Sequence, residues 1–590
     1  MEVSIGIIGN GFVGKATQLL CSPMIIQKVY DNIPEKCSPL GTTLDDIRKC
    51  DIIFVCVPTP MKIDGSCDTS IVEKIVKDLN VPNIIIRSTI PLGLTEKLNC
   101  HFMPEFLTEA NWKEDFRNAK NWIFGINENL PNTSLLKTKI RRLINYAYDD
   151  KSIFSKYILF RKPKEAEILK LIANTFLSTK VIYFNEMYDL CAKENINYEN
   201  VTELLALDDR IGKTHMMVPG YNNRRGYAGT CFPKDTNNFY ALFHHNNLNS
   251  SILESNLKMN ELVYRTDKDW LSDNGRTISN TNKKVIVVVG GAGFIGTNLC
   301  RELLKDDNNQ VVCVDNLSTG KLDNIQDLLN NKNFVFKKHD IVNMLFIPRC
   351  DEIYHLACPA SPPEYQRDPI KTLETNFIGT SNILKLAVNN KSKVLFTSTS
   401  EVYGDPNVHP QPETYWGNVN PIGIRSCYDE GKRVAETLMI EYKRKYNLDA
   451  KIVRIFNTYG PYMDINDGRV ITNFIKAIKN DTKIPIYGEG TQTRSFCYVD
   501  DMVYGLIKMM NSNESGPINL GNPDTEFQIK DLVGIFENII SSKLNVEYLD
   551  LPSDDPKQRK PIIDNAIEKL NWYPIVSLKD GLEKTYNYFN

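Results

Sequence analysis

The sequence lacks three features that would each define a class of protein. Its 14 cysteines include no CxxC pair and follow no regular spacing, which argues against a disulfide framework or a zinc site. No apolar run approaches the length of a transmembrane helix, and the N-terminal MEVSIG has no basic region or cleavage site. The net charge of −2 argues against broad binding to nucleic acid or acidic lipid. We therefore expect a cytoplasmic protein without a metal, a membrane or a nucleic-acid partner.

What is present indicates several ordinary globular domains. The chain has 590 residues, of which 42% are hydrophobic and 24% charged, and domains of about 100–200 residues would give three to five. Two apolar segments, residues 4–8 and 284–289, run directly into glycine-rich loops. Helical periodicity follows each loop, so each is the predicted start of a βαβ unit.

The order of predicted elements indicates an α/β protein with two Rossmann-type, doubly wound parallel sheets. Short apolar strands at 28–30, 51–57, 83–87 and 121–126 alternate with helical patterns. Residues 164–193 predict one long helix that leaves the first domain. The predicted domains are a first nucleotide-binding fold at 1–160, a helical middle domain at 161–265, a polar linker at 266–283, and a second fold at 284–590 with a smaller substrate part after about 484.

The two glycine loops predict binding sites for NAD. The first loop carries Gly9, Gly11 and Gly14, and Asp31 ends the following strand. In such loops the glycines permit a tight turn, close approach of the pyrophosphate, and close packing of helix on strand. The carboxylate would bind the ribose hydroxyls and repel a 2′-phosphate, which favours NAD over NADP. The alternative is a glycine turn that binds no ligand.

The second loop repeats this pattern. It ends at Gly296, and Asp315 ends the next strand. The predicted cofactor-binding residues of this half are Gly290, Gly293, Phe294, Ile295, Gly296, Asp315, Asn316 and Asp340.

Tyr428 and Lys432 are four residues apart and share one face of a predicted helix. A nearby ammonium favours tyrosinate, so the phenol could act as a base near neutral pH. Upstream, Thr399 ends an apolar strand, where its hydroxyl could polarise a substrate hydroxyl. The alternatives are a chance YxxxK match and a threonine that only caps its strand.

Five segments of the second half resemble UDP-glucuronate decarboxylase, a member of the extended short-chain dehydrogenases. They are CPASPPEY, STSEVYGDP, NPIGIRSCYDEGKR, RIFNTYGP and GTQTRSFCYVDD. The resemblance covers residues 284–590 and implies that Tyr428, with Lys432 and Thr399, removes the C4 hydroxyl proton as NAD accepts hydride. The resulting 4-ketone lies β to the carboxylate, which leaves as CO₂ before hydride returns and UDP-xylose forms.

The same resemblance assigns further roles. It implies that Glu401 steers decarboxylation or proton delivery, that Arg494 faces the diphosphate or the departing carboxylate, and that Asn457 and Arg559 contact UDP. An alternative is a nucleotide-sugar epimerase with the same fold and YxxxK pair. Glu401 and the CYDEGKR segment count against it.

Four pieces of the first half carry chemically useful residues. Residues 103–109 place Glu105 and Glu109 four apart, and Lys170 and Asn174 share a helix face at the same spacing. Residues 226–235, GYAGTCFPKD, present Cys231 in a glycine-rich loop beside a lysine and an aspartate. Residues 87–89 end a strand above the sheet. A buried and inert Cys231 is the alternative.

These pieces resemble the UDP-glucose 6-dehydrogenase family over residues 1–265. That resemblance implies oxidation of an alcohol to an acid with two NAD, through a thioester on Cys231. Lys170 and Asn174 would stabilise the oxyanion, and Asp235 or Glu109 would orient water with Thr89 nearby. Two substrate contacts are also implied, Glu105 and Arg210, of which Arg210 would reach the sugar bound by a partner subunit.

The sequence departs from this family because the usual third domain is replaced by the linker and the second fold. Our leading hypothesis is a bifunctional enzyme that converts UDP-glucose to UDP-glucuronate and then to UDP-xylose. The alternative is an active decarboxylase that carries an inactive module for dimerisation or for binding NAD and UDP-sugar. In either case we expect a homodimer or a larger homo-oligomer.

Overall fold

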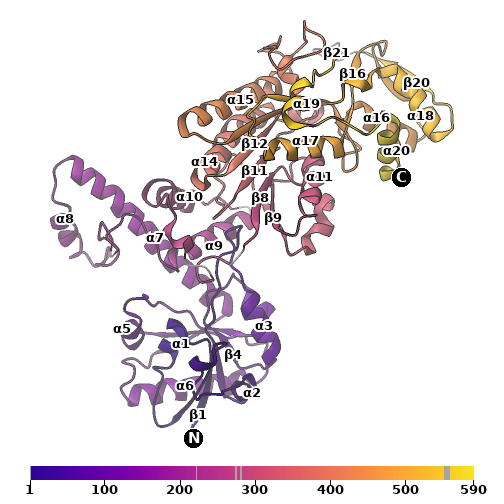
Figure 1. Cartoon of the computed structure of the whole chain (residues 1–590). Coiled ribbons are helices and arrows are strands. Elements are labelled where there is room, and N and C mark those ends of the chain that lie inside the picture. The colour runs from indigo at the N-terminus through magenta and orange to yellow at the C-terminus, as the bar shows by residue number, and fades with distance from the viewer. Residues whose placement is uncertain (1, 221, 247, 273–274, 280–281, 551–557) are drawn as a thin grey trace. The chain divides into compact units, whose positions relative to one another are not determined.

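The chain divides into two compact units, Met1–Thr281 and Asn282–Asn590. The computed structural model describes all residues except 1, 221, 247, 273–274, 280–281 and 551–557 (Figure 1). Each unit contains a seven-stranded sheet whose strands are mostly or wholly parallel, which confirms the predicted α/β class with two Rossmann-type sheets. Among the described helices, none combines the length and the apolar character needed to cross a bilayer.

The sheet of the first unit has the strand order β2-β1-β3-β4-β5-β6-β7. Only the β5–β6 pair is antiparallel among the pairs described. The strands are β1 (Val3–Ile8), β2 (Ile25–Tyr30), β3 (Ile52–Val55), β4 (Ile84–Ile86), β5 (His101–Phe102), β6 (Trp122–Gly125) and β7 (Ile158–Arg161). The strands predicted from the sequence all lie on these elements, and β5 and β7 are additional.

Helices cover both faces of this sheet, and the chain then continues into a long helix, α7 (Figure 1). The helices are α1 (Phe12–Thr17), α2 (Leu44–Arg48), α3 (Ser70–Leu79), α4 (Leu94–Lys97), α5 (Trp112–Arg117), α6 (Thr133–Asp149), α7 (Pro163–Lys193), α8 (Tyr198–Leu205), α9 (Phe232–His245) and α10 (Ser251–Met259), followed by a π-helical turn, η2 (Asn260–Tyr264), and a 3₁₀ turn, η3 (Asp269–Ser272). The observed α7 matches the single long helix predicted over 164–193.

The strands are apolar on both faces because each face packs into its own core. Ile5 and Ile7 of β1 belong to the core beneath α1, α5 and α6, whereas Ile8 belongs to the opposite core beneath α2, α3 and α4. Such burial on both sides explains the continuous hydrophobic runs of these strands. At Gly14 in α1, a Cβ atom would lie 1.9 Å from the carbonyl oxygen of Gly9. Only glycine therefore permits this approach of helix to strand.

The sheet of the second unit has the order β10-β9-β8-β11-β12-β13-β18, and all its pairs are parallel. Helices α14 and α15 pack together, as do α11 and α17 (Figure 1). The strands are β8 (Lys284–Val289), β9 (Asn309–Asp315), β10 (Phe334–Lys338), β11 (Glu352–His355), β12 (Lys393–Thr399), β13 (Ala450–Ile455) and β18 (Ile518–Leu520). The helices are α11 (Phe294–Leu303), α12 (Pro362–Arg367), α13 (Pro369–Glu374), α14 (Thr380–Asn390), α15 (Ser426–Tyr446), α16 (Val470–Lys479), α17 (Val499–Asn511), α18 (Leu532–Ile540), α19 (Asp564–Leu570) and α20 (Leu578–Phe589).

Three small sheets complete the described part of the second unit. They pair β14 (Thr458–Tyr459) with β17 (Cys497–Tyr498), β15 (Ile484–Tyr487) with β20 (Val546–Leu549), and β16 (Thr493–Ser495) with both β19 (Glu526–Gln528) and β21 (Gln558–Arg559). The small sheets and the main sheet contribute to one hydrophobic core. This core contains Val288 of the main sheet, Ile484 of β15 and Trp572. The part expected to form a smaller substrate domain is therefore continuous with the second fold.

Part of the expected linker is packed into the first unit. Arg265, Trp270, Thr277 and Ile278 are all buried, and Met61 pairs with Ile278 in an isolated parallel bridge. Its polar composition is typical of a linker, but its charged side chains form ion pairs. Asp269 pairs with Arg224 and Arg265, and Lys268 pairs with Glu261.

Candidate functional site

The second unit contains a cavity of about 1650 Å³ at the carboxyl ends of its parallel strands. Single small-ligand sites usually measure about 300–1,000 Å³, so the cavity has room for a dinucleotide together with a second ligand. Its lining includes fourteen of the fifteen predicted site residues of this half: Gly290, Gly293, Phe294, Ile295, Gly296, Asp315, Asn316, Asp340, Thr399, Glu401, Tyr428, Lys432, Asn457 and Arg494.

The glycine loop and Asp315 form the cofactor end of the cavity. Asp315 accepts hydrogen bonds from the backbone N–H groups of Ala292, at 3.0 Å, and Leu317, at 2.8 Å. Burial raises the pKa of this carboxyl group above its usual value, against these two hydrogen bonds. Asn316 donates to Asp340 at 3.1 Å. The loop, the helix N-terminus and the acidic strand end therefore have the arrangement that a dinucleotide requires.

Tyr428 and Thr399 both line the cavity. Tyr428 lies on α15, and Thr399 ends β12. Burial raises the pKa of Tyr428 well above its usual value, and the nearby Thr399 hydroxyl lowers that pKa only in part. Lys432 donates to the Thr397 carbonyl at 2.8 Å and lies 5.9 Å from the Tyr428 ring centroid. Burial of the phenol therefore opposes the tyrosinate form that the YxxxK spacing predicts.

Glu401 forms the centre of a buried ion network beside Tyr428. Its carboxylate pairs with Arg425 at 2.5 Å and with Arg559 at 3.0 Å. Burial raises the pKa of Glu401, but the attraction of Arg559, Arg425 and Arg494 outweighs burial and holds that pKa below its usual value. Glu401 is consequently an anion with fixed orientation.

The position of Arg559 differs from the expected contact with UDP. Its side chain is 1% exposed, and it donates to the Ser400 carbonyl at 2.9 Å as well as to Glu401. Arg559 is not among the described residues that line the cavity. The strand β21 carries it beneath Glu401, so its role in this structure is to hold that carboxylate.

Three residues of this site were not identified from the sequence. Tyr365 stacks on Tyr428 with ring centroids 5.0 Å apart and an interplanar angle of 9°. Arg425 pairs with Glu401, and burial together with the charge of Glu401 raises the pKa of Asp429 to about 7. Tyr365 lies in the CPASPPEY segment, and Arg425 and Asp429 flank Tyr428 on its helix. Both charged residues lie within one helical turn of Tyr428 in the sequence, and this spacing could have predicted that they lie near the site.

Asn457 and Arg494 lie at the other end of the cavity. The Asn457 side-chain nitrogen is buried and has no hydrogen-bond partner within the described part of the chain, which is costly unless a ligand supplies an acceptor. Arg494 donates to the Thr493 carbonyl at 2.9 Å. Both positions suit contacts with a polar or anionic ligand.

In the first unit, four predicted residues from distant segments form two buried pairs. Lys170 and Glu105 form an ion pair at 2.6 Å, and Asn174 donates to Asp235 at 2.5 Å. Burial lowers the pKa of Lys170, but the negative charges of Glu105, Asp235 and Cys231 raise it by a larger amount. The pKa of Lys170 is therefore above its usual value. Lys170 is therefore charged and Glu105 is its direct partner, a role that the sequence analysis did not assign to it.

Cys231 lies at the N-terminus of α9 and close enough to this cluster to affect Lys170. It is one of three cysteines that are not buried, with Cys21 and Cys358. Burial of the sulfur atom and the charge of Glu105 raise the pKa of the Cys231 thiol, against the attraction of Lys170. The neighbouring Lys234 donates to Thr59 at 3.4 Å. The thiol is thus placed for chemistry but protonated.

Three further predicted residues lie outside these pairs. Glu109 is half exposed and pairs with Arg276 at 2.5 Å, while Arg210 is almost fully exposed and pairs with Asp208. Thr89 is buried, and its carbonyl accepts from the Cys67 thiol at 3.5 Å. Of the two residues proposed to orient water, Asp235 is in the cluster and Glu109 is engaged elsewhere.

The first glycine loop also fits a dinucleotide. A Cβ atom on Gly11 would meet no atom within 4 Å, so space remains over the backbone where a pyrophosphate would bind. Asp31 follows β2 and accepts from the Asn10 backbone N–H at 2.7 Å. Gly9 and Gly14 are in mutual contact below this surface.

Comparison with known families gives three matches. Residues 286–521 match the NAD dependent epimerase/dehydratase family. Residues 32–138 match the NAD binding domain of the UDP-glucose/GDP-mannose dehydrogenase family, and residues 164–262 match the central domain of that family.

Individual relatives and a solved structure cover the second unit. UDP-glucuronic acid decarboxylase 3 of Arabidopsis thaliana is 52% identical over 297 residues, which are 50% of this chain and 86% of that protein. UDP-glucuronic acid decarboxylase 1 of Danio rerio is 48% identical over 313 residues, or 53% of this chain and 74% of that protein. A UDP-glucose 4-epimerase structure from Thermotoga maritima covers 52% of this chain and 98% of its own, with 29% identity and a TM-score of 0.48.

Fold, site and matches together define a protein built from two NAD-binding parts that belong to families of nucleotide-sugar enzymes. Through its second unit, the chain belongs to the UDP-glucuronic acid decarboxylase family. This decarboxylase part is fused to the NAD-binding and central domains of a UDP-glucose/GDP-mannose dehydrogenase.

Proposed function

We propose that the chain converts UDP-glucose to UDP-glucuronate in its first unit and UDP-glucuronate to UDP-xylose in its second. The observation that supports the second step is the meeting of Tyr428 and Thr399 beside the Glu401 ion network. The residues that support the first step are the Lys170–Glu105 and Asn174–Asp235 pairs around Cys231.

In the second unit, Tyr428 acts as a base in its tyrosinate form, so its own proton must leave before it accepts the proton of the sugar C4 hydroxyl. Thr399 orients that hydroxyl. NAD, held by the glycine loop and Asp315, would supply the acceptor for the C4 hydride and the source from which that hydride returns. The 4-ketone then receives the electron pair of the breaking carbon–carbon bond, and CO₂ leaves. Glu401, held by Arg425 and Arg559, keeps a fixed negative charge close to the reacting carbon and directs the proton that C5 must regain. The net reaction consumes no NAD.

In the first unit, Cys231 attacks the aldehyde produced by a first oxidation. Lys170 and Asn174 stabilise the resulting oxyanion, and a second oxidation gives a thioester. Asp235, fixed by Asn174 at 2.5 Å, orients the water that hydrolyses it. Because the thiol pKa is raised, its proton must leave as the sulfur attacks, and the buried carboxylates of the cluster are the available acceptors.

The alternative function of the first unit is that of a binding or dimerisation module. The raised pKa of the Cys231 thiol and the surface position of Glu109 favour it. Phe176, Tyr183 and Leu190 of α7 are exposed at seven-residue spacing, which is the spacing of a helix-pairing face. This exposed face also supports our proposal that the chain forms homodimers or larger homo-oligomers, whether or not the first unit is catalytic.

Incubation with UDP-glucose and NAD, with products identified by mass spectrometry, tests the proposal. A bifunctional chain yields UDP-xylose with two NADH for each sugar oxidised. A chain that converts added UDP-glucuronate to UDP-xylose but forms no NADH from UDP-glucose has a non-catalytic first unit.

A further inference from the structure

A segment after the central helices of the first unit folds back and contacts two parts of the dehydrogenase site. We call residues 265–272 and 275–279 the strap. Although its composition is polar, Arg265 is 1% exposed, and Trp270, Thr277 and Ile278 are also buried. The strap begins directly after a π-helical turn, η2, a kind of irregularity that is frequent at functional sites. Its burial requires partners in the body of the unit.

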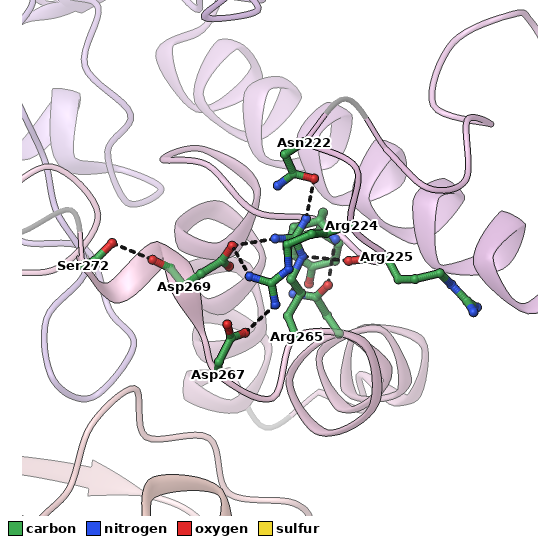
Figure 2. Close-up of polar contacts among 9 residues, drawn as sticks. Asn222, Arg224, Arg225, Arg265, Asp267, Asp269 and Ser272 are labelled. Atoms are coloured by element: carbon green, nitrogen blue, oxygen red, sulfur yellow. Dashed lines mark hydrogen bonds and ion pairs between the residues drawn. The ribbon is translucent and has the colours of Figure 1, made fainter.

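The first partner is the loop that leads to Cys231. Figure 2 shows the Arg265 guanidinium surrounded by acceptors from this loop and from the strap itself. It donates to the Arg225 carbonyl at 2.7 Å, to the Asn222 side chain at 2.8 Å and to Asp269 at 2.6 Å. A buried guanidinium is stable only with such acceptors. Arg265 therefore fixes the backbone six residues before the thiol.

A second set of contacts holds the next two residues of the same loop. Asn260 in η2 accepts from the Tyr227 N–H at 2.8 Å and donates to the Tyr227 carbonyl at 3.1 Å. Gly226 has a φ of +68°, and a Cβ atom there would lie 2.5 Å from the Asn260 amide oxygen and 3.2 Å from Arg265. The loop is thus packed against the start of the strap without room for a side chain.

The far end of the strap binds the loop around Met61, and this loop also contacts α9, the helix that begins directly after Cys231. Met61 donates to the Thr277 carbonyl and accepts from the Ser279 N–H, both at 2.8 Å. Ser279 also donates to Asp68 at 2.8 Å. Two residues before Met61, Thr59 accepts from Lys234, three residues after the thiol. The strap therefore joins both loops that flank the Cys231 cluster.

We propose that the strap is a positioning device for the dehydrogenase site and that Arg265 is its principal positioning residue. This inference rests on the proposed function of the first unit. The strap follows directly after the match to the dehydrogenase central domain, which ends at residue 262, and it lets the two loops be held by the first unit's own residues. Arg265 acts through the loop backbone and does not itself need to touch the substrate.

The test compares Arg265→Met with Arg224→Met in the full-length chain. Arg224 belongs to the same cluster and pairs with Asp267 at 2.8 Å and Asp269 at 3.0 Å, but its side chain is 41% exposed. Pairs that solvent reaches contribute little. For Arg265→Met we expect kcat for NADH formation from UDP-glucose to fall about tenfold or more, with KM changed far less, because a small misplacement of reacting groups is costly. Arg224→Met stays within about twofold of wild type, and Arg265→Lys recovers part of the loss.

Two readouts do not depend on turnover. Arg265→Met should speed carbamidomethylation of Cys231 by iodoacetamide and amide hydrogen exchange over residues 222–231, because the released loop opens more often. Labelling is resolved by peptide, since Cys21 and Cys358 are also accessible. Decarboxylation of added UDP-glucuronate by the second unit remains unchanged and reports intact protein.

The outcomes separate the two ideas. If wild type forms no NADH but Arg265→Met still speeds labelling and exchange, the proposed dehydrogenase fails and the strap stands. If Arg265→Met matches Arg224→Met in labelling, exchange and kcat, the strap proposal is overturned. Arg265→Met could also unfold the first unit, which would be seen as exchange throughout β1 and β3. In that case Asp269→Ala decides, because it removes one of the three acceptors of Arg265. Wild-type labelling and exchange in that variant overturn the proposal.

Discussion

Glu401 and Arg559 are 158 residues apart in the chain and form a buried ion pair at 3.0 Å. The pair places a fixed carboxylate beside Tyr428 at the point where the sugar would lose CO₂. Without Arg559, Glu401 keeps Arg425 as its remaining direct partner, and breaking a buried ion pair usually costs about 3–5 kcal/mol.

Arg559→Met should therefore reduce UDP-xylose formation from UDP-glucuronate by about a hundredfold or more. Glu401→Gln should slow decarboxylation more than the preceding oxidation, because Tyr428 and Thr399 remain in place, so enzyme-bound NADH accumulates at 340 nm. Tyr428→Phe is the matched control, since it removes the base and abolishes both steps. Normal product formation by Glu401→Gln would contradict the role given to this carboxylate.

The two activities should be separable by single substitutions. Cys231→Ala should limit NADH formation from UDP-glucose to at most the one NADH per sugar of the first oxidation, because the covalent step of the second oxidation is lost. Decarboxylation of added UDP-glucuronate should stay intact. Tyr428→Phe should have the opposite effect and cause UDP-glucuronate to accumulate. Spectrophotometry at 340 nm and mass spectrometry of the sugar nucleotides measure both. Formation of two NADH per sugar by Cys231→Ala would rule out the thioester route.

Both glycine loops should select NAD by charge. Asp31→Asn keeps the acceptor for the Asn10 N–H, now at 2.7 Å, but removes the negative charge that repels a 2′-phosphate. This variant should use NADP measurably better than wild type in the first reaction, with a smaller change for NAD. Asp31→Ala, which also releases the loop, should lose activity with both cofactors. Equal wild-type rates with NAD and NADP would refute the prediction.

Asp429 should make the stability of the second unit depend on pH. Burial and the charge of Glu401 raise the pKa of Asp429 to about 7 from an ordinary value of 3.8. The folded state thus binds this proton more tightly than the unfolded state, so the stabilisation is complete below the unfolded pKa and is lost as pH rises through about 7.

Asp429→Asn removes this dependence. Relative to wild type it should gain about 1–2 kcal/mol in unfolding free energy between pH 5.5 and 8. Amide hydrogen exchange of α15 at the two pH values measures the difference in the full-length chain. Glu430→Gln, one position away and partly exposed, is the control and should show little change. A gain that grows toward low pH would have the wrong sign.

Local patterns predicted much of this molecule. The alternation of strands and helices, the glycine loops, the acidic strand ends and the YxxxK pair all depend on residues close together in sequence. The structure confirms the two parallel sheets and the long helix α7. It places the predicted cofactor residues of the second half on one cavity, because parallel strands bring their carboxyl ends to a single edge.

Other features depend on pairs that no local pattern specifies. Arg559 resembled a nucleotide contact, but β21 carries it under Glu401, where the carboxylate compensates its buried charge. Glu109, predicted beside Cys231, pairs instead with Arg276 from the strap. Lys170 and Glu105 became partners across 65 positions because burial makes an unpaired charge too costly.

The sequence by itself determined the class of fold and the cofactor loops, since these rest on residue types at short, regular spacing. It also predicted the candidate residues of both sites. Only the tertiary structure decided that a polar stretch is a packed strap and that burial raises the pKa of both Tyr428 and Cys231. Burial and long-range ion pairing are properties of the whole packed chain. They follow from which distant segments exclude water from one another, and composition alone does not encode that choice.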